Sequence, residues 1–79
     1  MTLEELQEIL AEQFSCDAAE LERDTALADL GADHEDMVEL AWALGEAIGV
    51  EIDENELNVD MTIGELWRLA RDLEENAAE

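Results

Sequence analysis

The sequence contains no proline and no tyrosine, one cysteine, and only three basic residues against 24 acidic ones, so its formal net charge is −21. The single Cys16 cannot form an internal disulfide, and no apolar run is long enough for a membrane span or a signal-peptide core. We therefore expect a cytoplasmic protein. With so few cations to neutralise phosphates, binding to nucleic acid or to an anionic membrane is disfavoured, whereas basic protein surfaces are expected partners.

The length of 79 residues predicts one domain, residues 1–79, without room for a deep substrate cavity. Hydrophobic residues make up 48% of the chain, which is too many for a disordered segment despite the charge. A self-contained enzyme is therefore not expected. Repulsion among the acids should destabilise the fold at low ionic strength, so salt or divalent cations are predicted to stabilise it.

The first apolar stripe predicts a helix over residues 3–14, and Thr2 with Glu5 fits a capping box at its start. Residues 15–32 show no sustained period, which predicts a long structured loop with one short turn at residues 17–21. Three leucines of this loop are expected to pack it onto the core. They are Leu21, Leu27 and Leu30.

The second apolar stripe predicts a helix over residues 34–48, with Asp33 as its N-cap and Gly49 as its C-cap. After a short extended stretch, Asp53 is expected to cap a helical turn that runs through Leu57.

The last apolar stripe predicts a helix over residues 63–74, where Thr62 and Glu65 form a second capping box. The tail, residues 74–79, is expected to fray. Three main helices and one short helix with a long first loop define an all-α fold, a small antiparallel four-helix bundle.

The run Asp29 to Leu40, DLGADHEDMVEL, together with the order of elements and the acidic composition, resembles the acyl carrier protein family over nearly the whole chain. In that family the second helix follows a D-L-G-x-D-S-L-D-x-V-E-L signature, whose serine hydroxyl carries a phosphopantetheine arm that holds acyl groups as thioesters. Two downstream runs, Gly49 to Ile52 and Thr62 to Leu66, also resemble the family pattern. The signature positions that match are Asp29, Leu30, Gly31, Asp33, Asp36, Val38, Glu39 and Leu40.

The sequence departs from the family at the attachment residue. His34 stands where the serine belongs, and Glu35 replaces the leucine that follows it. Because imidazole offers no hydroxyl, no phosphopantetheine is expected on this chain, and the cofactor position at His34, flanked by Asp33 and Glu35, is predicted to be vacant. Ser15, the only serine, lies at the far end of the first helix, and the context of Thr25 does not resemble an attachment site.

The resemblance implies that the second helix docks onto basic patches of fatty-acid or polyketide synthases, reductases and transferases. An alternative is that its acids only form a solvated face. Trp42 is either an exposed binding residue or a core residue, whereas Trp67 is expected in the core. Gly45 weakens the analogy, since it stands where the family often has an acid and costs about 1 kcal/mol in mid-helix. The predicted partner-binding residues are Glu35, Asp36, Val38, Glu39, Trp42 and Glu46.

No catalytic constellation is visible, and no metal site is expected. A site made from His34 with Asp33 or Asp36 is disfavoured because neighbouring residues at a helix start do not converge on one ion. Residues 29–40 do not fit an EF-hand loop either, since apolar Leu40 stands where the bidentate glutamate belongs.

Three functional hypotheses remain. The first is a monomeric, non-enzymatic, acyl-carrier-like domain that docks onto or regulates enzymes of lipid metabolism without carrying acyl groups. The second is a genuine acyl carrier protein with a replaced or unusual attachment site. The third is an acidic interaction module that responds to metal ions.

Overall fold

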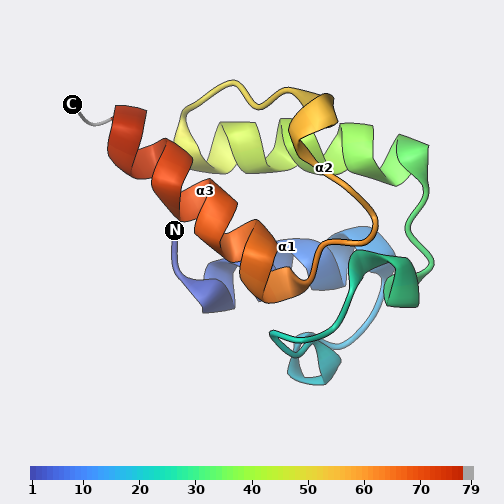
Figure 1. The fold of residues 1–79 in the computed structure, drawn as a ribbon. Helices are drawn as coiled ribbons and strands as arrows, with labels where there is room; N and C mark the ends of the chain where they lie inside the picture. Colours follow the sequence, from blue (N-terminus) through green and yellow to red (C-terminus); the bar gives the residue numbers. More distant parts are fainter. Residues whose placement is uncertain (78–79) are drawn as a thin grey trace.

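The computed structural model describes residues 1–77 and contains three α helices in that range: α1 (Leu3–Phe14), α2 (His34–Ile48) and α3 (Ile63–Ala77) (Figure 1). Three short 3-10 turns lie in the connections. They are η1 (Ala18–Glu20), η2 (Leu27–Leu30) and η3 (Glu54–Glu56). Apart from one isolated bridge between Ala26 and Thr62, the described residues form no β structure. The predicted all-helical class is confirmed.

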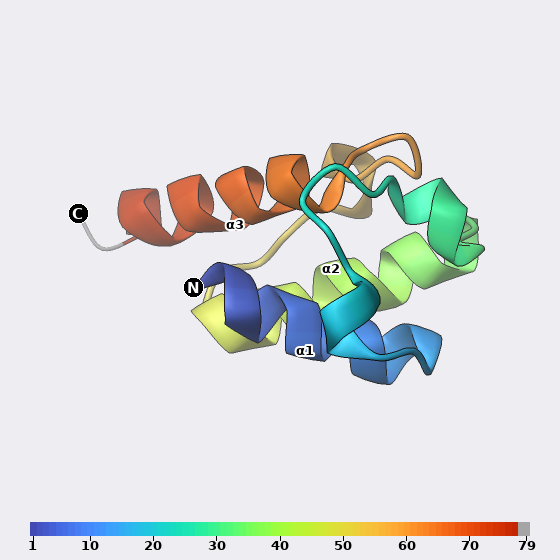
Figure 2. The ribbon, with the colours of Figure 1, turned by 90° about the horizontal axis from the view of Figure 1, so that it is seen from below.

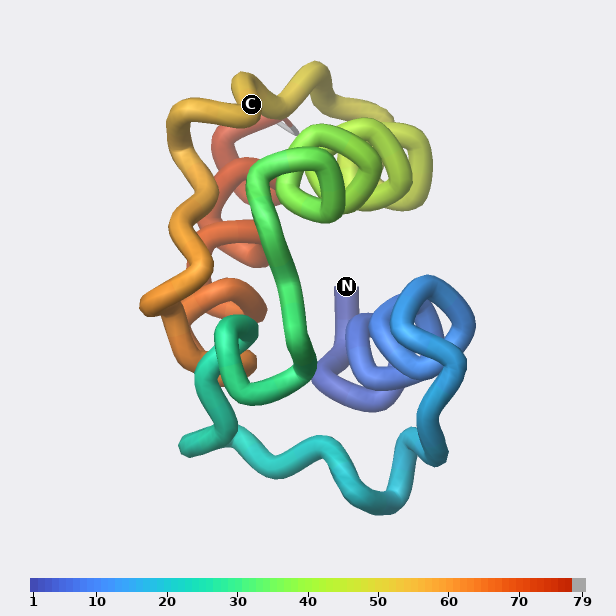
Figure 3. The backbone as a smooth tube through the Cα atoms, turned by 90° about the vertical axis from the view of Figure 1, so that its right-hand side faces the viewer, coloured from blue at the N-terminus to red at the C-terminus, as the bar shows by residue number. Residues whose placement is uncertain are grey.

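The three helices surround a common core, as the view along α1 and α2 shows (Figure 3). In the two side views, α1 runs opposite to α2 and α3 (Figures 1 and 2). The long connection over residues 49–62 brings the chain back, so that α3 follows the general direction of α2. This arrangement leaves the outer side of α2 open to solvent between α1 and the connection.

The core is formed by the predicted apolar stripes. Leu6, Leu10, Leu40, Leu44 and Leu66 are fully buried, and Leu21 and Leu27 of the first loop join them as expected. Each buried leucine contributes about 1.5–3 kcal/mol relative to an exposed position. The remaining buried core residues are Met37, Ala41, Ile52, Leu57, Ile63 and Ala70.

The first loop is held against the connection before α3 by backbone hydrogen bonds. The Leu27 amide donates to the Met61 carbonyl at 2.9 Å, and the Ala28 amide donates to the Val59 carbonyl at 2.8 Å. The predicted turn near residues 17–21 is confirmed as η1, whereas η2 was not predicted. The turn expected between Asp53 and Leu57 is confirmed as η3.

The predicted caps are present at the starts of all three helices. Thr2 and Glu5 form the capping box of α1, and the Glu65 amide donates to the Thr62 hydroxyl at 3.2 Å before α3. Gly49 ends α2 with a φ of 74°.

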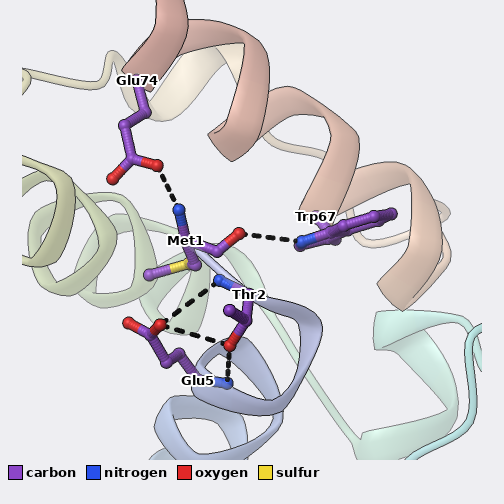
Figure 4. A network of polar contacts seen from close by, with 5 residues as sticks. All are labelled: Met1, Thr2, Glu5, Trp67 and Glu74. Carbon is purple, nitrogen blue, oxygen red and sulfur yellow. Dashed lines mark hydrogen bonds and ion pairs between the residues drawn. The ribbon is translucent and has the colours of Figure 1, made fainter.

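The predicted end of the last helix is wrong, because α3 continues to Ala77 instead of ending at residue 74. The predicted fraying is therefore wrong for residues 74–77, and residues 78–79 lie outside the described range. Two contacts hold the C-terminal part of α3: Leu73 packs against the core, and the Glu74 carboxylate pairs with the amine of Met1 (Figure 4).

Trp67 of α3 is half-buried and packs against the core without being part of it, so its predicted place in the core is confirmed only in part. Its Nε1 donates a hydrogen bond to the Met1 carbonyl at 3.1 Å, next to the Met1–Glu74 pair (Figure 4). Within residues 1–77, no helix is both long enough and apolar enough to cross a membrane.

Candidate functional site

The start of α2 is fixed by two carboxylates. The Asp36 amide donates to Asp33 Oδ1 at 3.1 Å, and the Asp33 amide donates to Asp36 Oδ2 at 3.0 Å. This reciprocal cap satisfies amides that a helix start otherwise leaves unpaired. A third bond, from Gln13 Nε2 to the Asp36 carbonyl at 2.8 Å, ties the end of α1 to the same turn.

His34 is the first residue of α2 and is exposed. Among the described residues it forms no side-chain hydrogen bond or ion pair. It lies beside an open groove of about 380 Å³ between the start of α2 and the η3 segment. The groove lining includes Met37, Glu54, Asn55 and Val59 in addition to His34.

The residues at this position do not fit a serine-linked prosthetic group. His34 and the exposed Glu35 that follows it offer no hydroxyl for a phosphodiester. The Thr25 hydroxyl lies in the first loop and accepts a bond from the Glu22 amide at 3.3 Å. Ser15 is exposed and ends α1 in a left-handed conformation, with a φ of 53°. The bond between Gln13 and the Asp36 carbonyl brings the end of α1 close to the first turn of α2. Ser15 lies two residues beyond Gln13 and is not part of the start of α2.

The outer face of α2 carries the two large hydrophobic side chains that are most exposed, Trp42 at 68% and Val38 at 39%. The alternative in which Trp42 packs in the core is therefore wrong. Val38 and Trp42 each line two open grooves, so the two side chains form a ridge that separates one groove from the other. One groove, of about 430 Å³, lies toward residues 49–54, and the other, of about 680 Å³, lies toward α1.

The grooves bring together four of the predicted partner-binding residues: Val38, Glu39, Trp42 and Glu46. The other two are placed differently. Asp36 is half-buried, with its carboxylate engaged in the helix cap, and Glu35 lies next to His34 on the exposed first turn.

Several residues of this surface were missed by the sequence analysis because they come from other elements. Ile9, Glu12 and Gln13 of α1 line the second groove, and Glu51 and Glu54 line the first. Only the packing of α1 and of the 49–54 segment beside α2 places them there. We call this shared surface the α2 docking face. It comprises the ridge of Val38 and Trp42 and the acids that line the two grooves: Glu12, Glu39, Glu46, Glu51 and Glu54.

Gly45 has a structural role in the first groove. A Cβ atom at this position would lie 2.7 Å from the Val50 carbonyl oxygen, which is closer than real Cβ contacts come. The Val50 amide in turn donates to the Gly45 carbonyl at 3.0 Å. The glycine thus allows the 49–52 segment to approach α2. The only sign of this close approach in the sequence is that a glycine stands in the middle of a helix.

No group of three or more histidine, cysteine or acidic side chains within residues 1–77 is arranged to hold a metal ion. Asp33 and Asp36 use their carboxylates in the helix cap, and Cys16 is half-buried at the end of α1. The only ion pair in the described part of the chain joins Met1 and Glu74. The acids of the α2 docking face are thus without cationic partners there and present a negative surface.

Comparisons with known proteins agree with the family resemblance. A family model described as the phosphopantetheine attachment site matches residues 4–70. The acyl carrier protein of Helicobacter pylori (strain G27) is 37% identical over 70 residues, which cover 87% of this chain and 90% of that protein. The acyl carrier protein of Helicobacter acinonychis (strain Sheeba) is 34% identical over the same shares. No solved structure matches with significance.

Proposed function

The chain belongs to the acyl carrier protein family, and from this premise we propose that it is a non-carrying member, which docks onto enzymes of lipid metabolism through α2. The observation that supports this proposal best is the pairing of two features on one helix. The attachment position holds His34, while the α2 docking face a few residues further along is open and acidic.

The proposal that this chain carries no acyl group rests on the chemistry of the residues at the start of α2. Phosphopantetheine in this family is linked through a serine hydroxyl, and neither His34 nor its neighbours Asp33 and Glu35 supplies one. A phosphoramidate on imidazole would be a weaker bond and is not the product of the transferases that prime carrier proteins. We infer that this chain carries no acyl thioester and catalyses no reaction.

Docking is supported by the composition of the α2 docking face. An exposed tryptophan surrounded by charged positions is a common anchor in protein interfaces, because its large ring gains from leaving water. The acids Glu39 and Glu46 beside it favour a partner with basic residues around an apolar recess, and such charges raise the rate of encounter.

The partners that fit are the basic patches of fatty-acid or polyketide synthases, reductases and transferases. We expect the domain to act there as a monomer in the cytoplasm, occupying or regulating docking sites that carriers use. Nucleic acids and anionic membranes are not expected as partners, because a net charge of −21 repels both.

The test of non-carrying is intact mass spectrometry after coexpression with a broad-specificity phosphopantetheinyl transferase. The unmodified chain is expected to keep its mass. His34→Ser and the double variant His34→Ser with Glu35→Leu are run in parallel, with an authentic acyl carrier protein as a control for transferase activity. The double variant is expected to gain the arm more completely, since it also restores the apolar residue that transferases contact.

A mass gain on the unmodified chain would contradict the proposal, and peptide mapping would then locate the modified residue, with Ser15 and Thr25 as the first positions to inspect.

Docking is tested separately by calorimetric titration of the unmodified chain with a synthase, a reductase and a transferase of the fatty-acid pathway. Trp42→Ala should weaken binding to a true partner at least tenfold, as expected for an interface anchor. Unchanged binding would exclude the α2 docking face as the contact.

A further inference from the structure

All three basic residues of the chain lie together near one face of α3. Gly64, Trp67, Arg68 and Arg71 follow the i, i+3, i+4, i+7 spacing that places residues on one side of a helix. Arg23 joins them from the first loop, where its carbonyl accepts a bond from the Gly64 amide at 2.9 Å. We call Arg23, Arg68 and Arg71, together with Trp67, the arginine face. All three arginines are exposed.

Trp67 positions two of the three guanidinium groups. The Cζ atoms of Arg23 and Arg71 lie over the indole ring, 5.4 Å and 5.0 Å from its centroid, within the range of cation–π attraction. The indole is itself held by its hydrogen bond to the Met1 carbonyl (Figure 4). A guanidinium above a ring keeps its N–H donors at its edge, so these two groups are ordered while they remain able to bind an anion.

Within residues 1–77 none of the three arginines forms an ion pair with a carboxylate, although the chain has 24 acids. Arg23 and Arg68 line an open groove of about 560 Å³, with Asp24 and Glu65 also in its lining. The Glu65 carboxylate is engaged in the cap of α3, where Oε1 accepts from the Thr62 amide and hydroxyl. Within the described residues, the guanidinium donors are therefore without a carboxylate partner.

We propose that the arginine face is a second interaction surface, which binds an acidic segment of a partner protein. Guanidinium groups bind carboxylates through paired, planar hydrogen bonds. The Cζ atoms of Arg23 and Arg71 lie 5.4 Å and 5.0 Å from the centroid of one indole ring, and Arg68 adds a third exposed guanidinium one residue beyond Trp67 along the helix, so the face presents three separate donor groups. Each of the three guanidinium groups can pair with one carboxylate, so a segment with several spaced acids can use all three, whereas Asp24 and Glu65 in the groove lining repel any anion and limit the affinity.

The net charge of the chain does not prevent this contact at physiological ionic strength. Charges are screened over about 8 Å there, so the acids elsewhere on the surface act weakly on a segment that touches the arginines directly. The groove of the arginine face shares no lining residue with the two grooves of the α2 docking face. The second surface therefore has the opposite charge preference and goes beyond the function proposed for α2.

The test is a titration of the ¹⁵N-labelled full chain with a synthetic helical peptide that carries glutamates at every third and fourth position, in 150 mM salt, followed by NMR. The amides of Gly64, Arg68 and Arg71 and the Nε–H signals of the arginines are expected to shift. Arg68→Gln should weaken binding about threefold, the size of one exposed ion pair. Arg68 is the variant of choice because the two arginines over Trp67 are left in place.

Asn76→Asp is the matched control, because it changes the net charge by the same amount at an exposed residue of α3 outside the arginine face. It should leave the affinity unchanged. Equal weakening by both variants, or the absence of any shift at these residues, would overturn the proposal. Saturation of the same signals by pyrophosphate with higher affinity would also overturn it in favour of a small-anion site. Shifts that depend on protein concentration without peptide would assign the face to self-association instead.

Discussion

Gly45→Ala is the substitution for which the sequence and the structure predict opposite results. Helix propensity alone favours alanine over glycine in mid-helix by about 1 kcal/mol. In the structure, however, the new Cβ atom would meet the Val50 carbonyl oxygen at 2.7 Å. Because that oxygen belongs to backbone, it can move away only if the segment after α2 moves with it.

That segment is held on both sides. The Val50 amide bonds to the Gly45 carbonyl at 3.0 Å, and Ile52, two residues further on, is buried in the core at 8% exposure. Overpacking a fixed site costs about 1–3 kcal/mol, and a weakened hydrogen bond costs about 1 kcal/mol more. After the gain in propensity is subtracted, we expect Gly45→Ala to lower the free energy of unfolding by about 2 kcal/mol. For a domain of this size that corresponds to a melting temperature about 10 °C lower.

The assay is urea unfolding followed by far-ultraviolet circular dichroism at fixed salt, since guanidinium chloride would screen the acidic surface as well as unfold the chain. Ala47→Gly, at an exposed position of the same helix, measures the propensity effect alone and should cost about 1 kcal/mol. If Gly45→Ala were instead more stable than the unmodified chain by the amount that Ala47→Gly loses, the close approach of the 49–52 segment would be refuted.

Four further outcomes are expected. Trp42→Ala should leave the free energy of unfolding within about 0.5 kcal/mol, because its side chain is 68% exposed; a larger loss in urea melts would mean that it packs in the core. Leu40→Ala should cost about 2–5 kcal/mol in the same assay, since its side chain is fully buried, and a loss below 1 kcal/mol would contradict its place in the core. Asp33→Ala should be less stable than Asp33→Asn by about 1 kcal/mol, because both remove one charge but only asparagine keeps the cap of α2; equal stabilities would argue against the cap. Raising sodium chloride from low to physiological concentration, or adding magnesium, should raise the melting temperature, and an unchanged value would contradict the assigned role of acidic self-repulsion.

The helices could be predicted from the sequence because their signals are local. The 3.6-residue period of the apolar side chains and the capping pairs gave α1 and α2 their observed limits. The end of α3 was placed too early because the contacts of Leu73 with the core and of Glu74 with Met1 are tertiary. The turn η2 was missed for a similar reason, since hydrogen bonds of Leu27 and Ala28 to the distant 59–61 segment hold it in place.

The candidate site was predictable only in part. The signature run placed His34 at the start of the second helix, where the structure has it. The sequence could not decide whether Trp42 is exposed or buried. Its position at the edge of the apolar stripe shows on which side of α2 it lies, but not whether another element packs against that side. Neither the grooves beside Trp42 nor the approach of Arg23 to Trp67 has a local signal, since each depends on segments far apart in the chain, whereas Arg71 follows Trp67 by one helical turn.

The structure also shows how the start of α2 is kept with a histidine at position 34. The cap of α2 is made by the side chains of Asp33 and Asp36 with each other's amides, and the side chain of His34, between them in sequence, takes no part in it. His34 is exposed and lies outside the core, so its side chain takes no part in the core packing. The cap of α2 and the core therefore depend on residues other than His34. Under the proposed function, carrying is lost through a position that neither the cap of α2 nor the core uses.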